Sequence, residues 1–157
     1  MIRCVRLWSG PDGNSHFEEG AIDLESGPRG DMLSNKFPIA SVSFQQTDSD
    51  PKLGWHPDPA RQLVITLSGA LEFTTHGGSF SLRAGDILFT EDTVAGHDWK
   101  LLDEQPWRRL YAILDQTTVV PFRPTEPRPT APVRRAKHGN QKQEQGHDPV
   151  CTNMDGR

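Results

Sequence analysis

The sequence is a succession of short apolar segments separated by turns that contain glycine or proline. The strongest segment, residues 63–67, reads Leu-Val-Ile-Thr-Leu and is followed by Ser-Gly. Similar segments follow at short intervals, at residues 71–75, 80–82, 87–90, 97–101 and 107–114. Closely spaced strands with turn signals between them are typical of sandwiches and barrels. No long segment repeats its apolar residues with the period of a helix, so the pattern predicts an all-β fold.

One central segment is apolar on both of its faces. Alternate residues of an extended chain share a face, so Leu63, Ile65 and Leu67 lie opposite Val64. A strand with two apolar faces needs cover on both sides, from the barrel interior on one and from a second layer or subunit on the other. The chain has few other elements for this role. The pattern therefore predicts a homodimer, formed through a sheet face or an exchanged N-terminal strand.

The composition changes near Pro121. Six of the 13 prolines fall in the last 37 residues, which are otherwise rich in Arg, Lys, Gln, Thr and Gly. Few apolar residues remain there to offset the entropy that is lost when a chain becomes ordered. The sequence therefore predicts one β domain over residues 1–115. Residues 116–157 are predicted to form a proline-rich, basic and disordered tail that is dispensable for folding.

The net charge of −4 is unevenly distributed. From residue 121 onward, seven Lys/Arg against four Asp/Glu give +3, which leaves −7 on residues 1–120. An acidic domain repels phosphate backbones, so we expect no nucleic-acid partner. The sequence has no recognisable signal peptide, no stretch long enough to span a membrane, and two cysteines in unlike contexts. These features predict a cytoplasmic protein without a membrane partner or a disulfide framework.

Polar side chains cluster around the strongest strand. His56, Asp58 and Gln62 are separated by even numbers of residues, so they share one face if the segment is extended. A later loop brings up His97. Two imidazoles, a carboxylate and an amide that converge inside a small barrel would make a metal site or an acid–base site.

The segment that carries these residues resembles the two motifs of the cupin superfamily, and residues 1–115 resemble a small single-domain cupin. The first family motif is Gly, five residues, His-x-His, three or four residues, Glu, six residues and Gly. The chain has His56, Asp58, Gln62 and Gly69 at the corresponding positions. The second motif runs here from Gly85 to His97, without the family's proline turn. The resemblance implies a jelly-roll β-barrel with a pocket between its sheets, often holding a divalent metal.

The resemblance implies a ligand set for that metal, with two changes of residue type. His56 and His97 fall on ligand positions, Asp58 stands where the family has its second histidine, and Gln62 stands where it has a carboxylate. A set of this kind would suit Mn, Fe, Ni or Zn. Pro57 and Pro59 restrict the backbone on either side of Asp58, and a bend there would turn its carboxylate away.

The resemblance leaves the reaction open. The first hypothesis is a divalent-metal-dependent enzyme that acts on a small organic substrate, of oxygenase, isomerase or lyase type. The alternative is a metal-free cupin that binds or senses a small ligand. A third is metal-free acid–base catalysis by His56 or His97. Asp92, in the loop before His97, and Tyr111, in the last predicted strand, are candidate catalytic groups.

Overall fold

The computed structural model describes residues 1–48 and 54–126. These residues form twelve strands and one short 3₁₀ turn, with no α-helix among them, so the all-β prediction is confirmed. The elements are β1 (Arg3–Ser9), β2 (Ser15–Ile22), β3 (Glu25–Ser26), η1 (Pro28–Gly30), β4 (Met32–Leu33), β5 (Ser41–Thr47), β6 (Gln62–Ser68), β7 (Ala70–Thr75), β8 (Gly78–Arg83), β9 (Ile87–Glu91), β10 (Asp98–Leu101), β11 (Trp107–Ile113) and β12 (Phe122–Pro124).

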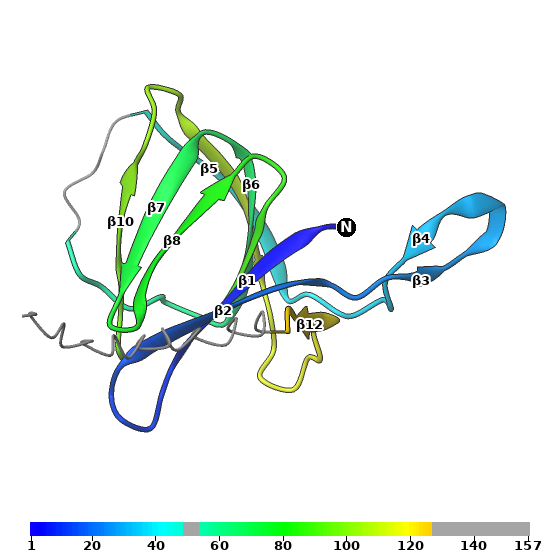
Figure 1. Cartoon of the computed structure of the whole chain (residues 1–157), viewed down its shortest axis with the longest axis horizontal. Helices are drawn as coiled ribbons and strands as arrows, with labels where there is room; N and C mark the ends of the chain where they lie inside the picture. The colour runs from blue at the N-terminus through cyan, green and yellow to red at the C-terminus, as the bar shows by residue number, and fades with distance from the viewer. Residues whose placement is uncertain (49–53, 127–157) are drawn as a thin grey trace, which may run out of the picture. The chain divides into compact units, whose positions relative to one another are not determined.

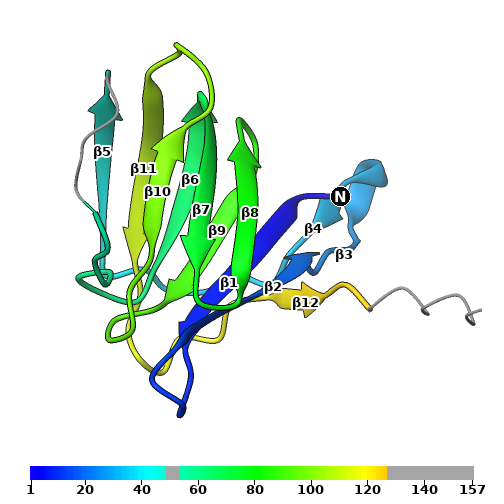
Figure 2. The same ribbon diagram turned by 60° about the vertical axis from the view of Figure 1, so that its left-hand side comes forward.

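Two main sheets organise the folded unit (Figure 1). The larger has seven strands in the order β12-β2-β1-β9-β6-β11-β5, and the smaller has three in the order β10-β7-β8. Within the larger sheet β1 and β9 run parallel, and the other pairs are antiparallel. Strands β3 and β4 form a separate two-stranded ribbon. Figure 2 shows β5 beside β11 at one edge of the large sheet.

The main hydrophobic core lies between the two sheets. Its fully or almost fully buried residues are Val5, Leu7, Val64, Leu71, Phe73, Phe80, Leu82, Leu88, Trp99 and Trp107. Phe73 is at its centre, stacked on Phe80 with ring centroids 5.2 Å apart and in edge contact with Trp107. Burial of each large apolar side chain stabilises a fold by about 1.5–3 kcal/mol. This cluster therefore holds the small sheet against the large one.

A second apolar cluster covers the outer face of the large sheet. It is formed by Cys4, Ile22, Leu63, Phe89, Ala112, Leu114 and Val120. The face predicted to need a second subunit is thus partly covered by the chain itself, because Leu63 packs against residues that follow β11. Leu67, at the far end of β6, remains 50% exposed. Burial raises the pKa of the Cys4 thiol to about 12, so this cysteine is unsuited to nucleophilic chemistry.

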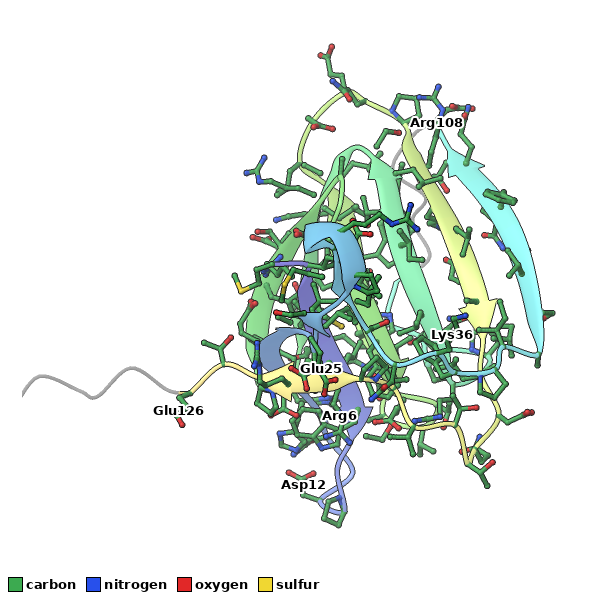
Figure 3. The ribbon with its side chains drawn as sticks, turned by 90° about the vertical axis from the view of Figure 1, so that its right-hand side faces the viewer. Arg6, Asp12, Glu25, Lys36, Arg108 and Glu126 are labelled. Carbon is green, nitrogen blue, oxygen red and sulfur yellow. The ribbon has the colours of Figure 1, made fainter. Side chains whose placement is uncertain are left out.

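The folded unit extends beyond the boundary predicted at residue 115. Strand β12 pairs with β2, with Phe122 opposite Ile22, and Val120 is only 8% exposed. The compact unit runs to Glu126, which follows β12 in Figure 3. The prediction of disorder is wrong for residues 116–126, because Val120 and Phe122 supply apolar surface despite the neighbouring prolines. The rest of the predicted tail, residues 127–157, lies outside the described residues.

Within residues 1–48 and 54–126, no helix is long and apolar enough to cross a bilayer.

Candidate functional site

The two motif histidines lie directly opposite one another. His56 and His97 form an isolated antiparallel bridge, with N–H···O distances of 2.9 Å from His56 to His97 and 3.0 Å in the reverse direction. Their ring centroids are 5.2 Å apart. Gly96 permits this approach: its φ is +83°, and a Cβ atom there would lie 2.9 Å from the carbonyl carbon of His56. The structure thus brings together two residues that are far apart in the sequence.

His97 is held by a buried carboxylate. Its Nδ1 lies 3.0 Å from Oδ2 of Asp92, and the two side chains are 2% and 0% exposed. The other oxygen of Asp92 accepts hydrogen bonds from the Ser9 hydroxyl at 2.6 Å and from the Gly96 N–H at 3.0 Å. Because an ionised carboxylate only accepts hydrogen bonds, Nδ1 of His97 is the donor in this pair. Asp92 therefore fixes the orientation of this imidazole.

Asp58 lies inside the same cluster and is not turned away by the flanking prolines. Thr90 donates its hydroxyl to Oδ2, and Gln62 donates an amide N–H to Oδ1 at 3.1 Å. The Asp58 N–H donates to the carbonyl of Asp92 at 2.9 Å. Burial raises the pKa of the Asp58 carboxyl and the Asp92 charge adds to this rise, against the opposing effects of His97, Thr90 and Gln62. The net effect favours a proton on Asp58 at a higher pH than is usual for aspartate.

A pocket of about 260 Å³ opens beside this cluster. It is lined by Ser43, Gln45, His56, Asp58, Pro59, Gln62, Tyr111 and Ile113. The Nδ1 atom of His56 lies 2.7 Å from the carbonyl of Gly54, so this ring is also oriented through one nitrogen. The pocket wall is mostly polar, and its residues come from β5, from β11, from the first residue of β6 and from the segment before it.

The structure divides the site residues predicted from the sequence into two groups. His56, Asp58, Gln62 and Tyr111 line the pocket, whereas His97 and Asp92 lie behind it as a buried pair. Asp92, a candidate acid or base, accepts hydrogen bonds from Ser9, Gly96 and His97 and orients the His97 ring. Sequence reasoning missed Thr90, which stands opposite Gln62 in the pairing of β6 with β9, and also missed Ser43 and Gln45 on β5. Alternation within β5 places Ser43 and Gln45 on one face, but only the pairing with β11 shows which face meets the pocket.

A complete set of charged metal ligands is not found in the described ranges, 1–48 and 54–126. No group of three or more His, Cys, Asp or Glu side chains is placed there to hold a metal ion. Both oxygens of Asp58 accept hydrogen bonds from Gln62 and Thr90. The donors that fit a metal are the Nε2 atoms of the two histidines, because a histidine that ligates through one nitrogen usually donates from the other. A third ligand would require Asp58 or Gln62 to exchange its present hydrogen bond.

Comparison with known proteins gives no further guide to the function. No family model matches the sequence, and no curated protein is significantly similar to it. The function therefore has to be inferred from the pocket and its surrounding side chains.

Proposed function

We propose that this protein is a small cupin-like protein whose pocket binds a small polar organic molecule. The observation that carries the proposal is the convergence of His56, Asp58, Gln62 and Tyr111 on one pocket of about 260 Å³. Pockets that bind small molecules have a few convergent polar groups, often with a perturbed pKa among them. The fold and the bridge between His56 and His97 support the resemblance to cupins.

The polar residues have separate roles in this proposal. Gln62 uses its amide N–H to hold Asp58 and keeps its carbonyl oxygen for a ligand. His56 offers its second ring nitrogen, because the first is occupied by Gly54. Asp58 is the best candidate for proton transfer, because burial raises its pKa and it lines the pocket. This arrangement provides a binding site that would also support acid–base chemistry.

The second candidate function is a divalent-metal-dependent enzyme. It is favoured by one observation: His97 and His56 each have Nδ1 occupied, by Asp92 at 3.0 Å and by the Gly54 carbonyl at 2.7 Å. This leaves two Nε2 atoms for Mn, Fe, Ni or Zn. A metal held there would polarise a bound oxygen of the substrate. Asp92 would then orient a metal ligand.

Metal analysis and calorimetry separate the two candidates. Protein purified without a histidine tag would be analysed for metals and titrated with Mn, Ni and Zn, beside the variants His56→Ala and His97→Ala. Near-stoichiometric metal that either substitution removes would establish the metal-dependent function. Absence of metal, together with thermal stabilisation by small polar molecules, is the result expected of a metal-free binding protein. A wild-type protein that binds neither metals nor small molecules would refute both proposals.

We also propose that the protein is a homodimer. Strand β5 is at the edge of the large sheet, and Val42 and Phe44 on its outer face are 45% and 71% exposed. Leu67 on β6 is half exposed, so the apolar surface left by the outer cluster lies at this end of the sheet. Exposed edge strands with apolar side chains are prone to association. Light scattering at tens of micromolar should give twice the chain mass, and Phe44→Glu should reduce it to the monomer mass.

A further inference from the structure

Arg109 is a buried cation without a carboxylate partner among the described residues. It is only 6% exposed. Its Nε donates to the Tyr111 hydroxyl at 2.9 Å, Nη1 to the Thr47 hydroxyl at 3.0 Å and to the Trp107 carbonyl at 3.2 Å, and Nη2 to the Gln45 amide oxygen at 3.1 Å. All four acceptors are neutral. By contrast, Arg61, whose side chain is 11% exposed, pairs with Glu91 at 2.7 Å.

These contacts stabilise the guanidinium only in part. It lies over the Trp107 ring, 3.7 Å from the centroid, which provides a cation–π contact. A guanidinium has five N–H donors, and the four hydrogen bonds leave one donor on Nη2 without an acceptor in the described part of the chain. A buried charge is costly unless it is paired with an opposite charge. The site is therefore electrostatically incomplete.

The guanidinium is directly connected to the proposed pocket. Two of the residues that hold it, Gln45 and Tyr111, also line the pocket that contains His56 and Asp58. Gln45 lies on the edge strand β5 and is exposed, so its side chain is free to exchange its hydrogen bond to Arg109 for one to a ligand. Gln45 and Tyr111 therefore stand between the guanidinium and the pocket that His56 and Asp58 line.

We propose that the pocket binds a small organic carboxylate and that Arg109 supplies the countercharge. The ligand carboxylate would take the free N–H of Arg109 and the one now used by Gln45, while Tyr111 orients the guanidinium. The rest of the ligand would lie toward His56 and Gln62. Arginine suits this role because its planar N–H groups match the two oxygens of a carboxylate. This inference rests on the proposed binding function and adds the class of ligand.

The test compares acids with their uncharged amides on the wild-type chain. The probes are benzoate and succinate, with benzamide and succinamide as the matched neutral compounds, titrated by calorimetry at constant ionic strength in a buffer without carboxylate or phosphate. At least one acid should bind about tenfold or more tightly than its amide. Equal affinity of acid and amide would overturn the inference, and this comparison requires no substitution that could impair folding.

Three variants then locate the countercharge. Arg109→Gln removes the charge and should weaken acid binding by about tenfold or more, whereas Arg109→Lys should lose less. The control is Arg108→Gln, because Arg108 is exposed, donates to Gln46, and lies near the start of β11 in Figure 3. Acid binding that survives in Arg109→Gln would also refute the inference. Binding of the amides but not the acids would refute it and leave the proposed function intact. A chain that binds none of the four probes would refute the inference, and it would refute the proposed function only if the chain also binds no metal and no other small polar molecule.

Discussion

Gly96 is the residue whose substitution would most directly test how the two histidines are held together. Its φ of +83° is a conformation that residues with a Cβ atom avoid. A Cβ at this position would lie 2.9 Å from the carbonyl carbon of His56, 3.0 Å from its oxygen and 3.0 Å from Nε1 of Trp55. Two of these atoms belong to the backbone, which cannot move without disturbing the bridge. We therefore expect Gly96→Ala to separate His56 from His97.

The expected loss of stability has two parts. The left-handed conformation alone costs alanine about 1–2 kcal/mol. Breaking the two backbone hydrogen bonds between His56 and His97 adds about 1–3 kcal/mol, at about 0.5–1.5 kcal/mol for each bond. The total for Gly96→Ala is therefore about 2–5 kcal/mol. At about 4 °C for each kcal/mol in a domain of this size, the melting temperature should fall by about 8–20 °C.

Gly85→Ala is the matched control. Gly85 has a φ of +93°, but a Cβ atom there would meet nothing within 4 Å. Its substitution therefore carries only the conformational cost of about 1–2 kcal/mol. Urea denaturation of the full chain, followed by tryptophan fluorescence, would measure both variants. If the two substitutions destabilise the chain equally, the close contact with His56 contributes nothing and the reasoning fails.

Three other predictions follow from the structure. A chain that ends at residue 126 should have the same free energy of unfolding in urea as the full-length protein. A chain that ends at residue 115 lacks Val120, Phe122 and β12, so its free energy of unfolding should be about 3–5 kcal/mol lower. Equal stability of the two truncated chains would show that β12 is not needed. Asp92→Asn should lower the free energy of unfolding by about 2–3 kcal/mol, because the buried carboxylate accepts three hydrogen bonds. Ser9→Ala removes only one of these bonds and should lower it less. A larger loss for Ser9→Ala than for Asp92→Asn in urea denaturation would contradict this account. Folding raises the pKa of Asp58, so the native state binds a proton on this carboxyl more tightly than the unfolded state does. The stability that protonated Asp58 contributes is therefore full below about pH 4 and is lost as the pH rises through the pKa of the folded state. The stability of Asp58→Asn relative to wild type should therefore increase from pH 4 to pH 8 in urea denaturation, and a decrease would mean that the pKa is lowered instead.

The alternation of apolar and polar residues predicted the long strands well, because such strands bury one of their two faces. The segment 63–67 lies within β6, and 87–90 and 107–114 correspond to β9 and β11 to within one residue. The same signal failed for β12, where three residues pair with β2 in a proline-rich stretch. A strand this short contains too few residues to show a period. Its stability comes from its partner strand and from the apolar contacts of Val120 and Phe122.

Part of the site was predictable from the sequence, but Ser43, Gln45, Thr90 and the hydrogen bonds were not. The spacing of His56, Asp58 and Gln62 placed them on one face, and the resemblance to cupins added His97. The bond from Thr90 to Asp58 depends on β6 and β9 pairing with Gln62 opposite Thr90. That register is a tertiary property, because a shift of one residue would move every side chain to the opposite face. The contact of Thr90 with Asp58 therefore could not be predicted before the strands were paired, whereas Gln62 was already expected on the same face as Asp58.

The inward face of β11 carries a charged residue where an ordinary core would have an apolar one. Trp107, Arg109 and Tyr111 alternate along this strand, and their partners on β5 are Thr47, Gln45 and Ser43. An apolar residue in place of Arg109 would remove the cost of burying a charge, and Trp107 would still provide apolar packing. Natural sequences tend to break the rules of core packing at functional sites, where a group is needed for a purpose other than stability. Arg109 is such a case, because its buried guanidinium donates only to neutral acceptors among the described residues and lies beside a polar pocket. A carboxylate ligand would supply the negative charge that the residues of β5 and β11 do not provide.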